Sequence, residues 1–310
     1  EMGRALLPAP FLSSAVLAVA ALRAAGEDPW SAQLLAGIAA GETVATVAFS
    51  GGLLCRPDES TVVATPSGEG WTLHGRVEAV LDGQSADTLL VVAPAGEELG
   101  LFVVAGGADG VVRTPLTVLD LTREAARVEF AGVGAQRIGG DFTAGQRTVL
   151  AVGASAMAAE LAGATQRVLE MAVEYAKIRE QFGRPIGSFQ AVKHLCADIF
   201  AIAESATAVA RYAARAVAAG AGQAEAASLA KAYTSDSCMD AAEMAVQVHG
   251  GIGFTWEHPV HLYLRRIASS AQYFGDSRHH RQRLAELLGL TAGAPVGARD
   301  LVPAVEPATV

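Results

Sequence analysis

Residues 175–190 read YAKIREQFGRPIGSFQ, and this stretch decides the fold because it separates two long helical patterns. The pattern before it covers residues 143–181 almost without interruption and stops at the Gly-Arg-Pro sequence of positions 183–185. The pattern after it covers residues 188–219, with Ser188 as the expected N-cap. The stretch therefore predicts a tight corner between two long helices.

The side chains at this corner favour an anionic, aromatic ligand. Arg179 offers a planar fork of N–H donors that suits a phosphate group. Phe182 can pack against a ring, and Gln190, expected one turn inside the second helix, can donate to a heterocycle. The alternative is purely structural, because a basic residue also stabilises the C-terminus of a helix.

Beyond the corner, the chain continues as helices with short connections. Helical patterns cover residues 224–249, 259–270 and 277–288, with turns rich in glycine between them. Long helices joined in this way predict an antiparallel four-helix bundle over residues 141–290. Residues 291–310 are rich in Ala, Gly, Pro and Val, and we expect a flexible tail there.

Before the corner, the pattern changes twice. Residues 43–140 contain short β-rich runs about ten residues apart with turn signals between them, which predicts an antiparallel barrel or sandwich. Residues 1–42 are helical, and the apolar run at 15–22 is too short to span a bilayer. We expect Ser13 or Ser14 to cap that helix. The order of helices, sheet and bundle predicts an α+β fold without a membrane span.

Composition excludes several classes of function. The net charge of −9 argues against a nucleic-acid-binding protein, which needs a basic face. Cys55, Cys196 and Cys238 are scattered, so neither a disulfide framework nor a zinc site is expected, and a cytoplasmic location fits. The adjacent His279 and His280 point to different faces of a helix and do not form a metal-binding pair. We therefore predict no metal site.

A second glycine-rich motif covers residues 247–254, QVHGGIGF. Glycines allow backbone amides to approach a ligand closely. The motif lacks the preceding strand of a dinucleotide fingerprint and the Lys-Ser/Thr of a P-loop. On its own, it is more typical of a plain turn between helices.

Taken together, the corner, the glycine-rich turn and the helix–sheet–helix order resemble the acyl-CoA dehydrogenase family. The resemblance covers nearly the whole chain, with residues 1–42 as a remnant of the N-terminal helical domain. Its motifs are Arg179-x-x-Phe182-Gly183-x-Pro185-Ile186-x-x-Phe189-Gln190, Gln247-x-x-Gly250-Gly251-x-Gly253-Phe254 and Glu257-x-Pro259.

This resemblance implies a flavoprotein that binds FAD and takes part in the α,β-dehydrogenation of an acyl-CoA thioester. In the family, the two motifs hold the FAD of a neighbouring subunit, which implies a homo- or hetero-oligomer, a dimer or tetramer. An electron-transfer flavoprotein is implied as the redox partner. The FAD-binding residues implied here are Arg179, Gln181, Phe182, Gln190, Gln247, Gly250, Gly251 and Asp276.

The catalytic base of the family does not align with a carboxylate in this chain. The family places its glutamate at one of two positions, and these correspond here to Phe274 and Gly153. Neither residue accepts a proton. The remaining candidates are Asp276, then Glu160, then Glu257. The family segments that contact the flavin from the β domain are also altered; they correspond to residues 49–52 and 80–83.

Two functions are therefore compatible with the sequence. In the preferred one, the chain lacks its own catalytic glutamate and completes the FAD site of a catalytic paralogue. That arrangement resembles the α2β2 complexes of some actinobacterial members, including those that act on steroid side-chain CoA thioesters. In the alternative, the chain is an active acyl-CoA dehydrogenase that uses Asp276 or Glu160 as the base.

Overall fold

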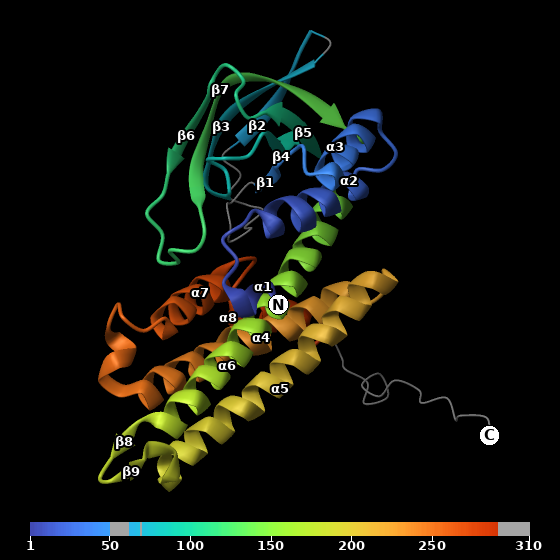
Figure 1. The fold of residues 1–310 in the computed structure, drawn as a ribbon. Coiled ribbons are helices and arrows are strands. Elements are labelled where there is room, and N and C mark those ends of the chain that lie inside the picture. Colours follow the sequence, from blue (N-terminus) through green and yellow to red (C-terminus); the bar gives the residue numbers. More distant parts are fainter. Residues whose placement is uncertain (50–61, 69, 291–310) are drawn as a thin grey trace, which may run out of the picture.

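The computed structural model describes residues 1–49, 62–68 and 70–290. Helices and a curled sheet form one end of the molecule, and a helical bundle forms the other end (Figure 1). The predicted tail at 291–310 and most of the predicted flavin segment at 49–52 lie outside the described residues. The α+β fold predicted from the sequence is confirmed.

The N-terminal helices differ in detail from the expectation. The long apolar helix begins at Phe11, so Ser13 and Ser14 are buried inside it and do not cap it. Its first part is π-helical. Asp28 caps the last of these helices by accepting hydrogen bonds from the backbone N–H groups of the next turn. The helices are α1 (Met2–Ala5), η1 (Phe11–Ala18), α2 (Val19–Ala24) and α3 (Pro29–Ala40).

The sheet has the strand order β1-β4-β5-β7-β3-β2, with β6 also paired to β7. Most pairs are antiparallel as predicted, but β1 pairs with β4 in parallel. The long β3 and β7 each curl through the sheet, and both contain register shifts where they pair. The strands are β1 (Ala45–Phe49), β2 (Val62–Ser67), β3 (Gly70–Leu81), β4 (Thr88–Ala95), β5 (Glu98–Ala105), β6 (Val111–Pro115) and β7 (Ala125–Ile138).

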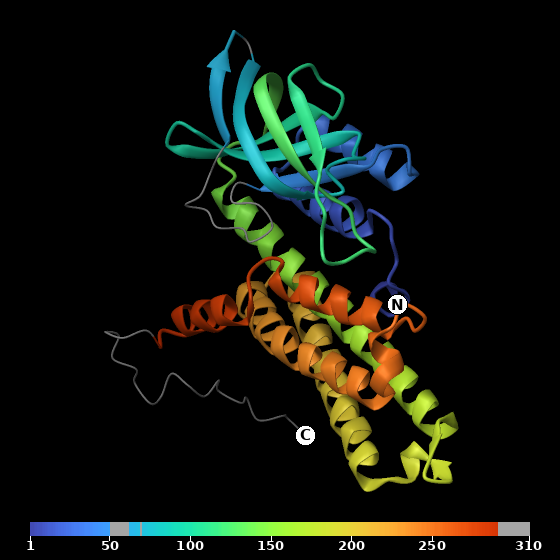
Figure 2. The same cartoon turned by 90° about the vertical axis from the view of Figure 1, so that its left-hand side faces the viewer.

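The bundle is built on α4, which runs from the sheet to the far end of the molecule (Figure 2). Many of its buried residues are alanines and glycines, so neighbouring helices approach closely. Its length and hydropathy would suit a membrane span, but 61% of its apolar window is buried, as in the central helix of a bundle. The helices are α4 (Thr143–Ile178), α5 (Gln190–Ala219), α6 (Gln223–His249), α7 (Val260–Gln272) and α8 (Ser277–Leu287).

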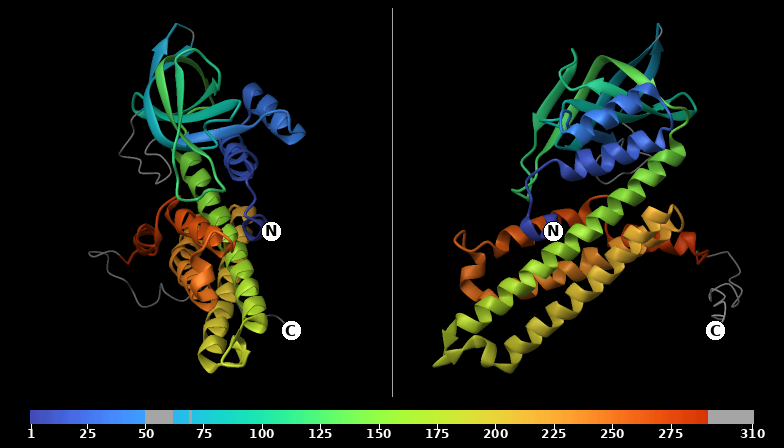
Figure 3. Two further views of the ribbon diagram at one scale, coloured as in Figure 1. Left: turned by 60° about the vertical axis from the view of Figure 1, so that its left-hand side comes forward. Right: turned by 45° about the vertical axis from the view of Figure 1, so that its right-hand side comes forward.

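The predicted corner is a short hairpin between α4 and α5, at the tip of the bundle (Figure 3). It contains β8 (Glu180–Gln181), β9 (Arg184–Pro185) and the 3-10 turn η4 (Ile186–Ser188). Ser188 does not cap α5, because its hydroxyl donates to the Pro185 carbonyl at 2.7 Å within η4. Gln190 is the first residue of α5, not one turn inside it.

Candidate functional site

The corner presents its predicted ligand-binding side chains to solvent. Arg179 is the C-cap of α4 and lies on the surface. The Phe182 side chain is 91% exposed at the tip of the hairpin, where φ is +54°. Gln190 Nε2 lies 2.8 Å from Nε2 of His194. These groups face outward, as residues that contact a second molecule must.

A ring contact joins the corner to the glycine-rich turn, although the two motifs are far apart in the chain. Tyr175 stacks on His249, with ring centroids 4.8 Å apart and an interplanar angle of 27°. His249 is buried, and its Nδ1 donates to the Ala245 carbonyl at 2.7 Å. Burial lowers the pKa of His249. The stacked pair holds Arg179 and Gly250 at the same end of the bundle.

The turn itself, η5 (Gly250–Phe254), has the open backbone that a flavin nucleotide needs. Gly250 has φ +62°, and nothing lies within 4 Å of the place where a Cβ would be at Gly250 or Gly251. Phe254 and Trp256 beside the turn are 80% and 72% exposed. Among the described residues, an arginine fork and an unobstructed glycine turn thus fit the phosphates and the ring of FAD.

The two positions that the resemblance assigns to the base meet at one point in space. A Cβ at Gly153 would lie 2.9 Å from the Phe274 ring and 3.1 Å from Leu17 Cδ2. Phe49 packs edge-on against Phe274, with ring centroids 6.4 Å apart. All four residues are buried, and their side-chain atoms are apolar. In the part of the chain that the structure describes, the meeting point is filled by hydrocarbon and holds no carboxylate.

The backbone around Phe274 is fixed by two buried side chains, Lys231 and His280, for which the sequence predicted no such role. Lys231 is fully buried, and its Nζ donates to the carbonyls of Ala271 at 2.7 Å and Gly275 at 3.0 Å. His280 Nε2 donates to the Phe274 carbonyl at 3.0 Å. These three bonds support the positive φ of +61° at Phe274. A lysine in the apolar sequence AASLAKAY, residues 226–233, could have raised suspicion, because such a residue needs buried acceptors.

Asp276 and Glu257, two of the predicted candidates for the base, lie in different surroundings. Asp276 is the N-cap of α8 and accepts from the backbone N–H of His279 at 2.7 Å. Glu257 is exposed before α7, whose 13 residues separate it from Phe274. At a rise of 1.5 Å per residue, that helix is roughly 20 Å long.

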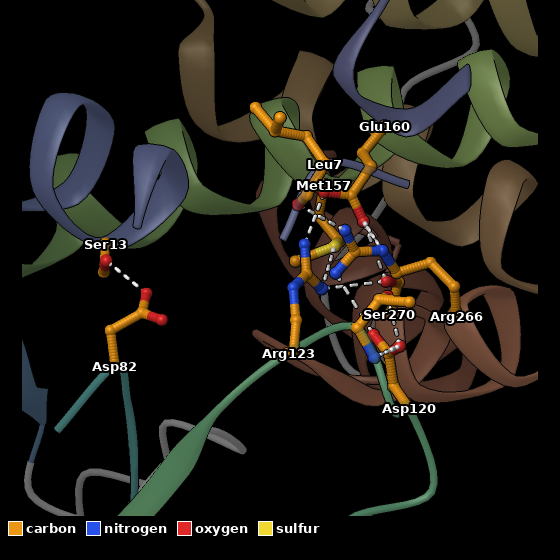
Figure 4. Close-up of polar contacts among 10 residues, drawn as sticks. Leu7, Ser13, Asp82, Asp120, Arg123, Met157, Glu160, Arg266 and Ser270 are labelled. Atoms are coloured by element: carbon orange, nitrogen blue, oxygen red, sulfur yellow. Dashed lines mark hydrogen bonds and ion pairs between the residues drawn. The ribbon is translucent and has the colours of Figure 1, made fainter. Parts of the chain in front are cut away.

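Glu160 is committed to a network of charges (Figure 4). One of its oxygens pairs with Arg123 Nη2; the other accepts from Ser270 Oγ at 3.1 Å and lies 3.7 Å from Arg266 Nε. Arg266 also pairs with the buried Asp120 at 3.2 Å. The charges of two guanidinium groups and two carboxylates therefore neutralise one another. Glu160 is held in ion pairs, whereas a general base needs a carboxylate free to reach the substrate.

Glu160 and both arginines line a cavity of about 680 Å³. It lies between the N-terminal helices, two turns of the sheet and α4. Asp82, in the turn after β3, lines the same cavity and accepts a hydrogen bond from Ser13. Asp82 belongs to residues 80–83, the segment that the resemblance relates to the flavin, whereas no role was predicted for Arg123. Their partners are 69 and 37 positions away along the chain.

The order of helices, mostly antiparallel sheet and helical bundle, with an exposed corner suited to a flavin nucleotide, defines the fold of the acyl-CoA dehydrogenases. A sequence model described as "Acyl-CoA dehydrogenase, C-terminal domain" matches residues 142–289. "Acyl-CoA dehydrogenase IpdE2" of Mycolicibacterium smegmatis is 33% identical, over 92% of this chain and 75% of that protein. "Acyl-CoA dehydrogenase FadE34" of Mycobacterium tuberculosis is 37% identical over 93% of this chain.

This chain belongs to the acyl-CoA dehydrogenase family, as the sequence predicted. It spans 37% of the length of FadE34. The ChsE4-ChsE5 complex of Mycobacterium tuberculosis is similar in structure, with a TM-score of 0.82 and 29% identity over 95% of this chain and 79% of that chain. A variant of the Tcur3481-Tcur3483 steroid ACAD has a TM-score of 0.83 and 29% identity, over 93% of this chain and 78% of that chain.

Proposed function

We propose that this chain is a subunit of an FAD-dependent acyl-CoA dehydrogenase that completes the FAD site of a catalytic partner and does not abstract the substrate proton itself. The observation that carries the proposal is the contact between Phe274 and Gly153. A general base must reach the α-carbon of the thioester, and geometry decides this before its pKa does. Here both family positions for the base are occupied by one apolar cluster.

The exposed corner supports the other half of the proposal. Arg179 and the backbone at Gly250 would hold the phosphates of the partner's FAD, and Phe182 would pack against it. When bound, FAD accepts the hydride that leaves the β-carbon of the thioester. The task of this chain is to hold and orient that cofactor and to cover it with Phe254 and Trp256, which excludes water.

The related structures support a complex of two different chains. One of them is named as the ChsE4-ChsE5 complex, and another as a steroid ACAD with two named components. We therefore propose a paralogue with a glutamate at the position of Phe274 or Gly153 as the partner, and a steroid side-chain or other bulky acyl-CoA as the substrate. An electron-transfer flavoprotein would reoxidise the flavin.

The test compares this chain alone with the pair. Each is expressed, and flavin absorbance is recorded before and after addition of acyl-CoA thioesters without oxygen. We expect the pair to carry FAD that acyl-CoA bleaches, and the chain alone to show no bleaching. In the pair, Arg179→Ala in this chain should lower the FAD content, whereas Arg76→Ala, in the sheet, should not.

The opposite results have clear meanings. Bleaching by the isolated chain would show that it is an active dehydrogenase. In that case Asp276→Asn and Glu160→Gln, tested separately, would identify the base by loss of bleaching.

A further inference from the structure

Two histidines and a tyrosine join the glycine-rich turn η5 to the corner at the tip of the bundle. His249 and His258 flank this turn in the sequence, and their ring centroids lie 4.3 Å apart. Tyr175 stacks on His249 at 4.8 Å and lies edge-on to His258 at 6.3 Å. The Tyr175 carbonyl accepts from the Arg179 N–H at 2.9 Å, so one turn of α4 carries both residues. This ring cluster therefore connects the two segments proposed to hold FAD.

The hydrogen bonds of the ring cluster require both histidines to be neutral. His258 Nδ1 accepts from the Val260 N–H at 3.3 Å, so a proton on this nitrogen would face another donor. His249 Nδ1 donates to the Ala245 carbonyl at 2.7 Å, which leaves Nε2 without a proton in the neutral ring. This Nε2 is buried and has no hydrogen-bond partner among the described residues. Burial lowers the pKa of His249 and outweighs the carbonyls of Ala245 and Met171, which favour the protonated ring.

The charged groups around His258 do not offset a proton on its ring. Burial lowers the pKa of His258, and His249 on α6 and His261 on α7 lower it further. Arg265, also on α7, adds a positive charge beside His261. Glu257 precedes His258 in the chain and is exposed. Among the described residues, no carboxylate is a cause of the pKa of either histidine in the ring cluster.

We propose that His249 and His258 position the turn η5 and the corner relative to each other, and that protonation of His258 releases them. His258 is the member that a proton reaches, because it is half-buried whereas His249 is buried. A charge on it would face the His249 ring and the Val260 N–H. The expected consequence, loss of FAD from the shared site below pH 6.5, rests on the proposed function. The opening itself is a property of this chain alone.

Hydrogen exchange of the purified chain tests the opening without FAD or a partner. The backbone amides of residues 249–260 are followed at pH 7.5 and pH 5.5, and their rates are corrected for the intrinsic pH dependence of exchange. Once released, His258 has its ordinary pKa of 6.5 and is about ten times more often charged than neutral at pH 5.5. Protection should therefore fall about tenfold at the lower pH. The amides of residues 199–213 in α5 report global unfolding and should keep their protection; unchanged protection at 249–260 would overturn the proposal.

Two variants of His258 identify the titrating group. His258→Asn keeps an acceptor close to the place of Nδ1, and His258→Phe keeps a ring, but neither side chain takes up a proton. The loss of protection between pH 7.5 and pH 5.5 should disappear in both. His74→Gln, at an exposed position in β3, is the matched control and should keep the loss seen in the parent. Circular dichroism shows that each variant is folded, and a parental pH dependence in both His258 variants would contradict the assignment.

Release of FAD from the pair of subunits, followed by flavin fluorescence, tests the consequence for the shared site. The dissociation constant of FAD should rise about tenfold from pH 7.5 to pH 5.5 in the parent pair, whereas this rise should be absent in a pair that contains His258→Asn. The same rise in both pairs would overturn the positioning role of His258. A pair that takes up no FAD would instead contradict the proposed function, and hydrogen exchange of the chain alone would still decide whether protonation opens the ring cluster.

Discussion

The Phe274 ring lies directly against Gly153, so that even a methyl group on this glycine would approach it to 2.9 Å. Replacing Gly153 by alanine should therefore strain the core. Overpacking costs about 1–3 kcal/mol, and the better helix propensity of alanine returns about 1 kcal/mol. We expect a net loss in the free energy of unfolding, measured with urea.

A double-mutant cycle separates the contact from the helix effect. The Gly153→Ala change is repeated in a Phe274→Leu background, where the facing ring is gone. We expect Gly153→Ala to become neutral or stabilising there. An equal loss in both backgrounds would show that the strain at Gly153 does not come from Phe274.

The sequence predicted those parts of the fold that local patterns determine. The helix ends around 175–190 and 247–254 are marked by glycine and proline, whose backbone preferences act locally. The parallel pairing of β1 with β4 could not be predicted, because each strand has the same alternation whichever neighbour it joins.

For the same reason, the sequence predicted one part of the candidate site and missed another. The exposed corner is contiguous in sequence, so its motif was visible. The partners of Glu160 were not, because Arg123 is 37 positions away and Ser270 is 110 positions away. The residues that fix the Phe274 backbone, Lys231 and His280, likewise act through carbonyl groups that no sequence motif reveals.

Lys231 should make the free energy of unfolding depend on pH between 7 and 9. Burial lowers its pKa from 10.5 to about 7. Between these values the unfolded chain binds more protons than the folded chain, so the free energy of unfolding should rise as pH increases from 7 to 9. Lys231→Met should remove this rise and destabilise the fold, because the carbonyls of Ala271 and Gly275 lose their donor. Urea unfolding at several pH values tests this, and an unchanged pH slope in the variant would contradict it.

His280 should contribute to acid sensitivity. Burial is the main cause that lowers its pKa from 6.5 to about 3. Its neutral form is kept in the folded chain while the unfolded chain takes up a proton, so stability should fall as pH drops from 6.5 towards 3. His280→Gln should reduce this loss while its amide still donates to the Phe274 carbonyl. The matched control is His279→Gln, at the exposed neighbouring position, which should keep the acid sensitivity of the parent.

Arg123 joins the sheet side of the molecule to the bundle through Glu160, so its removal should be costly. Arg123→Met leaves the carboxylate of Glu160, which is only 15% exposed, without its closest partner. Breaking a buried pair in this way costs about 3 kcal/mol, whereas an exposed pair contributes little. Arg281→Met, which breaks the exposed pair with Asp236, is the matched comparison. Urea unfolding should show a clearly larger loss for Arg123→Met, and Arg123→Met combined with Glu160→Gln should recover part of it, because no unpaired charge then remains. Equal losses for the two arginine variants would mean that solvent screens the Arg123–Glu160 pair as well.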